Sequence, residues 1–570
     1  MPEQICSDFV YSEEYWNFLI KYDNDLESIN NIVEPDCVNI INSQFLVAYK
    51  KLDSSQNLYD YGYNSVPKCF GLMDTTVLES IGANTVRSLP GLGLTGENVL
   101  IGFVDTGIDY RNPLFINRDG TSRIEAIWDQ SISGSNAPIF GFGEEFRRQE
   151  ISRALNEENP YDSVATRDEN GHGTFLASVA AGGENREEDF SGIAPSARLA
   201  VVKLKQVKNN LREYMLINPN VECYGEDDIM LGVKYLINKA VELDMPLVIC
   251  VGLGSNQGDH NGNSNLELYF QTISNLRGVC VITAGGNEVG ARGHFSGNNR
   301  INKLAAKEDM EISVGAEDKG FVMEVWGNAP GILALSVLSP TGERKMVPSP
   351  VRDGRSQFSF LYEGTPVTID NYVVDPNTGD QLVVLRFLNP TEGIWTVVVE
   401  ETVGIIGGGF DAWLPIAQFL NSETVFVRPD PDVTICTPAS GSGSITVGGY
   451  NHSNNALYLN SSRGFTRKGN IKPDIVAPAV DVQGVLAAGD NLLFIRKTGS
   501  SVASAVTAGA VGLILEWGLV KGNNRGITTQ VIRQMLIRGS RQVADVEYPS
   551  RSWGWGALDV YNAFNSIRDM

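Results

Sequence analysis

The sequence contains few histidines and little positive charge for its length. Only four histidines occur among 570 residues, so an active site that depends on histidine has a short list of candidate bases. The 68 acidic residues outnumber the 45 basic ones, which gives a formal net charge of −23. Because phosphate binding needs a basic face, this balance argues against nucleic acid as the main partner.

The sequence also lacks a recognisable leader and a long uninterrupted apolar run. Residues 1–23 show no basic start followed by an apolar core, so we expect no secretory signal. The longest weakly polar run, residues 502–517, is interrupted by Ser504, Thr507 and Glu516. It falls short of the ~20 apolar residues that cross a bilayer, so we expect no membrane partner.

Cysteine is sparse, and its spacing does not suggest a metal site. The seven cysteines are odd in number and show no paired ligand spacing. Cys250 and Cys280 lie within apolar, strand-like runs. We therefore predict buried free thiols in a reducing compartment rather than a disulfide framework.

What the sequence does contain is a succession of buried strands and helices. Near-continuous apolar runs rich in β-branched residues predict strands over 98–105, 197–204, 246–252 and 278–286. Such runs are typical of parallel strands that are covered on both faces. Residues 226–244 keep a helical apolar spacing and begin with acids, which predicts a helix. The alternation predicts a doubly wound α/β fold with a mostly parallel sheet.

From about residue 311 the pattern changes to short strand-like segments that are separated by Gly, Pro, Asn or Asp and show no helical period. The predicted strands of this block are 321–327, 332–340, 356–364, 366–375, 380–389 and 393–401. They predict an antiparallel sandwich of the jelly-roll kind. The α/β pattern resumes with predicted strands 444–450 and 473–479, so the β block is an insertion.

These patterns divide the chain into four predicted segments. They are a small N-terminal α+β segment over 1–63, a first α/β part over 64–305, the inserted β domain over 306–425 and a second α/β part over 426–570.

One sequence motif is rejected as a nucleotide-binding site. The stretch "GLGLTG" at residues 91–96 matches a dinucleotide fingerprint, but it precedes a predicted strand instead of following one.

The stretch "KTGSSVASAVTAG", residues 497–509, holds three candidate nucleophiles at the head of a predicted buried helix: Ser500, Ser501 and Ser504. A serine hydroxyl is a good nucleophile only when a neighbouring base, usually a histidine held by a carboxylate, takes its proton. Backbone N–H groups of a first helical turn would also stabilise an anion that forms beside them. Taken alone, a serine here is equally well explained as an N-cap.

Among the histidines, His172 has the most suitable surroundings for a base. Glycines flank it in "NGHGT" and leave the imidazole uncovered, although a histidine at a helix start is more often structural. His260 and His452 lie in loops rich in Asn, Gly and Ser and are expected to be exposed. His294 is expected either to line a cleft or to cap a turn.

Asp105 is the candidate carboxylate because it ends the predicted strand 98–105. The carboxyl ends of parallel strands face the ligand crevice of an α/β sheet. A carboxylate there can hold an imidazole by a charge-assisted hydrogen bond. A polar residue in a strand-end turn is the alternative explanation.

Together, these residues occur in the order Asp, His, Ser, which is the subtilisin order. The stretches "VDTGID", "NGHGT" and "GSSVASA" resemble the three signature blocks of subtilisin-like serine proteases, or subtilases. The resemblance runs from about residue 64 to the C-terminus. It implies that Ser501 is the nucleophile, that His172 is the general base and that Asp105 orients the imidazole. This chemistry needs no organic cofactor or metal, and we assign no metal ligands.

The same resemblance extends to the residues that hold a substrate. Asn287 in "TAGGNEVG" matches the side-chain donor of the family's oxyanion hole, where it acts together with the backbone N–H of Ser501. The stretch "VGLGSN" looks like the family's substrate-binding strand. Gly252, Leu253 and Gly254 are therefore expected to pair with an extended peptide and to form a wall of the P1 pocket.

The predicted insertion, the N-terminal segment and the missing secretory signal together resemble the Csp subgroup. These are germination proteases of clostridial spores, which activate the precursor of a cortex-degrading hydrolase. In the wider family the enzyme cuts off its own N-terminal prodomain, and the stretch "GYNSVPKCFGL", residues 62–72, resembles a mature start, which implies a cut between Tyr59 and Ser65. The Csp resemblance implies that the cleaved prodomain stays bound and occludes the cleft. The expected partners are then a precursor protein and the cleaved prodomain, in the cytoplasm or the spore. Two alternatives remain: a catalytically silent signal-binding or scaffold relative, and an intracellular protease of protein turnover.

Overall fold

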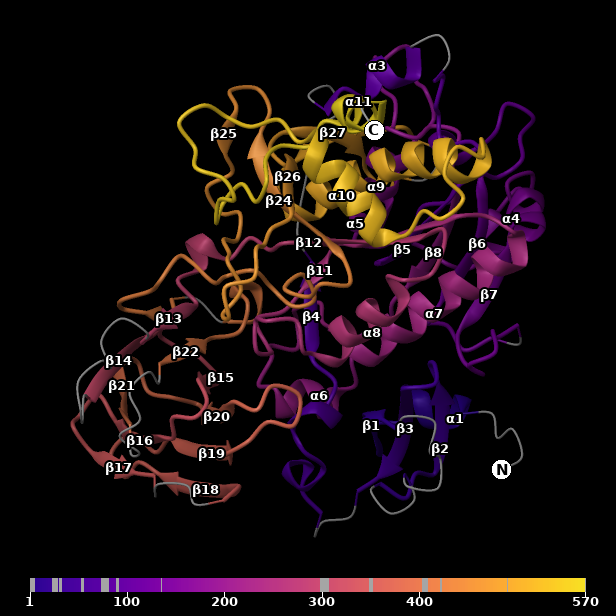
Figure 1. The fold of residues 1–570 in the computed structure, drawn as a ribbon. Helices are drawn as coiled ribbons and strands as arrows, with labels where there is room; N and C mark the ends of the chain where they lie inside the picture. The colour runs from indigo at the N-terminus through magenta and orange to yellow at the C-terminus, as the bar shows by residue number, and fades with distance from the viewer. Residues whose placement is uncertain are drawn as a thin grey trace.

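The structure contains a mostly parallel central sheet, a two-sheet β block, a small N-terminal sheet and, in its described residues, two further short antiparallel sheets (Figure 1). The computed structural model describes residues 6–22, 29, 33–52, 56–72, 81–88, 92–134, 136–297, 307–347, 352–401, 409–420, 423–488 and 491–568. The predicted boundary at residues 305 and 306 lies outside these ranges.

Within the described residues the central sheet has nine strands, and the four predicted apolar strands lie side by side in it. β5 (Leu100–Asp105) lies between β8 (Arg198–Lys203) and β10 (Leu247–Val251), and β12 (Val279–Ala284) follows β10, all in parallel register. The remaining strands are β6 (Ile124–Asp129), β7 (Glu144–Arg147), β24 (Ile445–Asn451), β25 (Ala456–Leu457) and β26 (Ile475–Pro478). β7 and β25 pair antiparallel at the two edges. The predicted α/β fold is confirmed.

Side chains along the central strands alternate between two apolar cores. Four helices cover them: α5 (His172–Ala181), α7 (Glu226–Leu243), α8 (Asn265–Ile273) and α9 (Ser500–Leu515). Ile101 and Phe103 of β5 lie in one core with residues of α5 and α9. Leu100 and Val104 lie in the other core with residues of α7 and α8. Burial on both faces explains why these strands are continuously apolar.

α9 passes through the first core. A π-helical turn, Glu516–Val520, extends it, and the stretch Ser500–Val520 has the length and composition of a membrane-spanning helix. The expectation that this run falls short of such a helix was therefore wrong. Its most apolar window is 89% buried inside the protein, so its apolar character is that of a core helix.

The β block consists of two antiparallel sheets that share one apolar core. One sheet has the order β13-β22-β15-β20-β19-β18 and the other has the order β17-β16-β21-β14-β23. Their bounds are β13 (His294–Ser296), β14 (Lys307–Val314), β15 (Gly320–Gly327), β16 (Leu333–Leu338), β17 (Arg344–Met346), β18 (Gly354–Ser359), β19 (Pro366–Tyr372), β20 (Gln381–Leu388), β21 (Gly393–Glu401), β22 (Phe410–Trp413) and β23 (Val425–Phe426). All six predicted strands are present, and β13 joins the block upstream of the predicted boundary at residue 306.

The N-terminal segment forms a small antiparallel sheet beside α7 (Figure 1). Its elements are α1 (Ser7–Val10), β1 (Tyr15–Lys21), β2 (Cys37–Ile40) and β3 (Phe45–Lys51), with the strand order β1-β3-β2. The side-chain amide of Asn17 donates to Asp227 of α7 at 2.6 Å, and the ammonium group of Lys208 donates to the carbonyl oxygens of Phe9 and Tyr15. Polar contacts therefore hold this segment on the α/β body.

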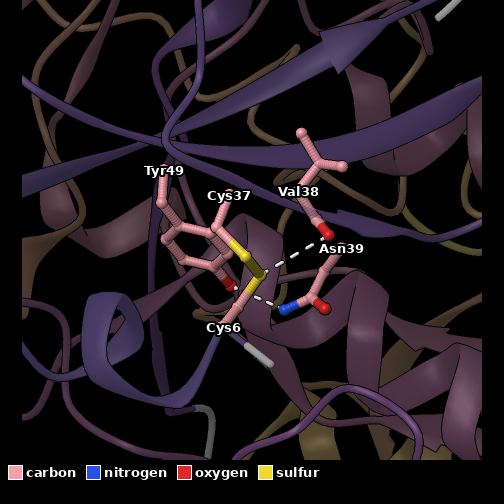
Figure 2. Close-up of a disulfide and its surroundings, with 5 residues drawn as sticks. All are labelled: Cys6, Cys37, Val38, Asn39 and Tyr49. Atoms are coloured by element: carbon pink, nitrogen blue, oxygen red, sulfur yellow. Dashed lines mark hydrogen bonds between the residues drawn. A yellow bond between two sulfur atoms is a disulfide. The ribbon is translucent and has the colours of Figure 1, made fainter. Parts of the chain in front are cut away.

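Cys6 and Cys37 form a disulfide, which Figure 2 shows beside Tyr49. The prediction of free thiols was therefore wrong for this pair. Cys6 directly precedes α1 and Cys37 opens β2, and their Cα atoms are 5.8 Å apart. The other five cysteines are free and buried, as predicted. The sequence could not identify the pair because its spacing does not show which strand lies beside α1.

Shorter elements complete the described chain. They are η1 (Leu58–Tyr61), η2 (Tyr63–Ser65), β4 (Cys69–Leu72), α3 (Ala83–Ser88), η4 (Pro113–Phe115), α4 (Arg148–Ala154), η5 (Pro160–Asp162), α6 (Asn209–Tyr214), β9 (Tyr224–Gly225), β11 (Leu253–Gly254), η6 (Val289–Ala291), η7 (Ala417–Phe419), β27 (Val482–Val485), β28 (Phe494–Lys497), α10 (Thr529–Gly539) and α11 (Val560–Arg568). β4 lies between β9 and β11 and pairs antiparallel with both.

Candidate active site

The side chains of Asp105, His172 and Ser501 meet at the carboxyl end of the central sheet. Nδ1 of His172 lies 2.7 Å from Oδ1 of Asp105, and Nε2 of His172 lies 3.2 Å from Oγ of Ser501. All three residues are buried, with at most 2% of their surface exposed. A carboxylate that accepts a hydrogen bond from Nδ1 leaves Nε2 as the basic nitrogen that faces the hydroxyl. The geometry therefore allows the imidazole to take the serine proton.

The three residues converge because each lies at the end of an element. Asp105 is the last residue of β5, His172 is the first residue of α5 and Ser501 is the second residue of α9. A Cβ atom on Gly173 would lie 2.2 Å from the carbonyl oxygen of Gly107, in the turn after β5. The glycine after His172 therefore lets α5 approach the strand end closely enough for the hydrogen bond to Asp105.

Sequence reasoning missed Asp168, which organises the start of α5. Its carboxylate accepts hydrogen bonds from the hydroxyls of Thr106 and Thr174 and from the backbone N–H groups of Gly171 and Thr174, all at 2.6–2.8 Å. These contacts fix the segment that carries His172 to the turn after β5. The sequence shows only an acid four residues before His172, which looks the same as the surface acids around it.

Asn287 follows β12 and faces the start of α9. Its side-chain oxygen accepts the backbone N–H of Ser500 at 2.9 Å, and Oγ of Ser500 accepts the N–H of Gly286 at 3.1 Å. Fixing the amide oxygen in this way directs Nδ2 away from Ser500. Asn287 is partly exposed, unlike the fully buried Ser501 next to it in the fold. Its amide nitrogen is therefore in a position to donate to a group outside the protein.

The other two candidate serines have structural hydrogen bonds. The hydroxyl oxygen of Ser500 accepts a hydrogen bond from the N–H of Gly286. The hydroxyl of Ser504 donates a hydrogen bond to the carbonyl oxygen of Ser501. Ser504 also contacts the thiol of Cys250 at 3.6 Å. Of the three, Ser501 is the serine whose hydroxyl contacts a histidine.

Gly252, Leu253 and Gly254 lie directly beside these side chains. An ideal Cβ on Gly252 would be 3.2 Å from the Cβ of Ser501 and 3.3 Å from Cε1 of His172. A side chain at residue 252 would therefore press on both the nucleophile and its base. Leu253 and Gly254 form the short strand β11. Another strand of the same chain pairs with one edge of β11.

The strand that pairs with β11 is β4. Leu253 pairs with Leu72, and Gly254 pairs with Gly71, in antiparallel register. On its other edge β4 pairs with β9. The chain's own β4 thus occupies the place where an extended peptide would add a strand to β11. Its carboxyl end runs toward Gly252, because residue 72 lies opposite residue 253.

Two further histidines have structural positions. The rings of His260 and His294 both stack on the ring of Trp413, with centroid distances of 4.1 Å and 4.8 Å. Both histidines are 1% exposed, so the expectation that His260 is exposed was wrong. His294 also contacts the carboxylate of Asp411 at 3.2 Å. This stack fastens the β block to the α/β body.

Among the described residues, no group of three or more His, Cys, Asp or Glu side chains has a geometry that would hold a metal ion. The polar groups that surround Ser501 are the imidazole, amide and backbone groups described above.

The sequence profile of the subtilase family (Peptidase_S8) matches residues 96–378 and 423–556, and the chain belongs to this family of serine endopeptidases. Among solved structures, the CspB protease of Clostridium perfringens is similar to it. The identity is 29%, the match covers 86% of this chain and 98% of that chain, and the TM-score is 0.75.

Curated relatives from Arabidopsis thaliana are also similar to parts of the chain. Subtilisin-like protease SBT3.3 is 26% identical over 219 residues, which cover 34% of this chain and 26% of that protein. Subtilisin-like protease SBT3.6 is 22% identical over 495 residues, which cover 78% of this chain and 58% of that protein. The chain therefore spans about a quarter of the first relative and less than two thirds of the second.

Proposed function

We propose that the protein is a serine endopeptidase in which Ser501, His172 and Asp105 act as the catalytic triad. Oγ of Ser501 attacks the peptide carbonyl carbon while Nε2 of His172 takes its proton. The imidazolium then gives this proton to the leaving amine, and a water molecule hydrolyses the acyl-enzyme by the same route. Asp105 holds the imidazole and stabilises its charged form. The observation that carries the proposal is the continuous Asp105–His172–Ser501 hydrogen-bonded chain.

The oxyanion that forms on the carbonyl oxygen needs donors that are already in place. Nδ2 of Asn287 and the backbone N–H of Ser501 serve as these donors. The bond from the Ser500 N–H to the Asn287 oxygen supports this role, because it fixes the amide without using its nitrogen. Leu253 and Gly254 bind the substrate backbone as an added strand, and Gly252 leaves room for the carbonyl beside Ser501.

The N-terminal segment acts as a prodomain that the enzyme removes from itself. The register of β4 on β11 supports a cut just after Leu72, within residues 73–80, instead of between Tyr59 and Ser65. The latter interval forms η1 and η2, and Tyr63 there packs edge-to-face against Trp326 of the β block. β4 then remains as a strand in the cleft and excludes other peptides.

The inserted β sandwich is of the jelly-roll kind.

The protein substrate is a precursor that is activated by limited proteolysis. A cleft that is already filled by the chain's own strand favours one or a few substrates over general digestion. The likeness to the CspB protease over nearly its whole length supports a cortex-hydrolase precursor in spore germination as that substrate. A protease of general turnover needs an open cleft. A silent scaffold has no need for the hydrogen bonds of His172 to both Asp105 and Ser501.

A serine-directed phosphonate probe followed by peptide mapping tests the catalytic proposal. The processed wild-type protein should carry the label on Ser501, and the His172→Ala variant should label at least about tenfold more slowly because the base is missing. Labelling of Ser500 or Ser504 instead, or equal labelling of the His172→Ala variant, would overturn the assignment.

A further inference from the structure

Two free cysteines lie together where β4 enters the cleft. Cys69 is the first residue of β4, and Cys223 directly precedes β9, the strand that pairs with β4. The pairs Cys69–Gly225 and Phe70–Tyr224 place Cys69 and Cys223 as diagonal neighbours across the two strands. Both are completely buried, and both belong to the same apolar cluster.

The two cysteines belong to different sides of the proposed cut. Cys69 lies upstream of it, in the segment that occupies the cleft, whereas Cys223 lies downstream, in the α/β body. In the reduced protein, β4 is held by non-covalent contacts, which include its backbone pairing with β9 and β11 and the hydrogen bond from the N–H of Cys69 to the side chain of Gln257. After the proposed cut, its carboxyl end is no longer attached to the rest of the chain. A covalent bond between these two sulfur atoms would keep the cut segment in place.

We propose that Cys69 and Cys223 form a reversible disulfide that locks β4 in the substrate cleft. The inference rests on the proposed function, because a locked strand matters only if the cleft is a protease cleft and the chain is cut after β4. Linked in this way, the segment cannot diffuse away, so its rebinding to the cleft is intramolecular and effectively complete. Reduction releases the lock and lets the segment exchange with a substrate.

The reaction is a thiol–disulfide exchange with a low-molecular-weight disulfide such as oxidised glutathione. One protein thiolate attacks the small disulfide, forms a mixed disulfide and releases one small thiol. The second protein thiolate then attacks the mixed disulfide, which forms the Cys69–Cys223 bond and releases the second small thiol. Two protein thiols are oxidised and one small disulfide is reduced to two thiols, which take up the two protons.

The burial of both thiols controls the rate of this exchange. The hydrogen bond to Cys223 and desolvation raise the pKa of the Cys69 thiol well above its usual value. Because the thiolate is the reactive form, the pair reacts slowly while β4 is seated and faster when the strand lifts out. The same burial then protects the formed disulfide from reductants.

The other cysteines provide matched controls. Cys6 and Cys37 are both upstream of the cut, so their disulfide cannot link the two pieces. Cys280 is also completely buried, and desolvation raises its pKa to about 12. It lies in β12, within the apolar core that contains residues of α5 and α9. A Cys280→Ser variant therefore controls for the loss of a buried thiol.

The first experiment uses the full-length Ser501→Ala variant, so that it does not depend on catalysis. The variant is incubated with oxidised or reduced glutathione, and its disulfides are mapped by mass spectrometry without reduction. We expect a peptide pair joined through Cys69 and Cys223 in the oxidised sample, beside the Cys6–Cys37 pair in both. Absence of the Cys69–Cys223 pair after oxidation, with Cys69 and Cys223 recovered as thiols, would overturn the proposal.

The second experiment uses the catalytically intact protein. On a denaturing gel without reductant, the oxidised wild type should run as one linked species that separates into two pieces on reduction. Its hydrolysis of a peptide substrate should fall at least tenfold on oxidation and recover with dithiothreitol. The Cys223→Ser variant should lose this response and the Cys280→Ser variant should keep it. Equal inactivation of the Cys223→Ser variant would contradict the lock, whereas a mapped disulfide without any cutting would contradict the proposed function alone.

Discussion

The backbone of Gly252 lies against the side chain of Ser501: a Cβ atom on residue 252 would be 3.2 Å from the Cβ of Ser501 and 2.8 Å from a methyl carbon of Leu176. The position thus joins the strand expected to bind the substrate to the nucleophile itself. Because Leu176 belongs to α5, the same contact connects the substrate strand to the helix that carries His172.

A Gly252→Ala substitution should therefore reduce activity by about 10²-fold, because displacing reacting groups by about an ångström has an effect of this size. The protein should still fold, since the added methyl group affects only the immediate surroundings of residue 252, at Leu176, Ser501 and His172. Peptide hydrolysis and circular dichroism measure the two effects. Gly354→Ala, on a strand of the β block where an added Cβ meets no atom closer than 3.9 Å, is the matched control and should keep full activity. Equal activity of both variants would contradict the placement of residue 252.

Replacing Asn287 by alanine should lower kcat by ~10²–10³-fold with little change in KM. This magnitude is the one known for subtilisin, which belongs to the same family. The reason is that the amide nitrogen stabilises the oxyanion, which exists only after the attack. Steady-state kinetics on a peptide substrate measure kcat and KM separately. A raised KM with unchanged kcat would show that Asn287 binds the ground state instead.

An Asp168→Asn variant should slow the reaction although residue 168 does not contact the hydroxyl of Ser501. An amide presents one acceptor oxygen and one donor nitrogen, so part of the set of donors from Thr106, Gly171 and Thr174 loses its acceptor. The unfolding free energy should fall by about 1–3 kcal/mol and kcat should fall with it. Glu169→Gln, at the exposed neighbouring carboxylate, is the control and should behave as the wild type. Unchanged kcat and stability in Asp168→Asn would refute the positioning role.

The buried imidazole of His260 should make the protein sensitive to acid. Desolvation lowers its pKa to about 4 from the ordinary value of 6.5. Between these values the unfolded chain binds a proton that the folded chain does not, so stability falls as the pH falls from 6.5 toward 4. The loss between pH 7 and pH 5 is roughly 2 kcal/mol.

Two buried carboxyl groups act in the opposite direction. Desolvation raises the pKa values of Glu267 and Glu288 to about 7, so their contribution to stability is lost as the pH rises from 4.5 to 7. The His260 contribution is therefore measured as a difference between variants. Urea unfolding of His260→Gln at pH 7 and pH 5 should show a smaller drop on acidification than the wild type. An identical loss of unfolding free energy in both proteins would contradict the predicted contribution of His260.

The sequence predicted most of the α/β fold because burial on both faces makes the parallel strands continuously apolar. It also predicted that Asp105, His172 and Ser501 act together, since each lies in a local motif that can be read without knowledge of the fold, and the structure brings these three side chains into contact. Local sequence carries no such signal for Asp168, whose partners are mostly backbone N–H and hydroxyl groups, or for the pairing of Cys6 with Cys37. The stacking of His260 and His294 on Trp413 likewise depends on segments that are far apart in the chain.

The position of β4 could not be predicted for the same reason. A four-residue strand gives almost no periodic signal, and its partners β9 and β11 are themselves two residues long. Their antiparallel pairing arises only when the central sheet brings the two short strands to the same edge of the cleft. The predicted cut between Tyr59 and Ser65 was based on sequence resemblance alone, and the later bond within residues 73–80 is our proposal from the register of β4.

The most direct test of the account is the intact mass of the purified wild-type protein beside that of the Ser501→Ala variant. The account predicts two pieces from the wild type, with the new end within residues 73–80, and a single full-length chain from the variant. A wild-type chain that stays whole, or a variant that is cut at the same bond, would contradict the claim that Ser501 cuts the segment that β4 presents.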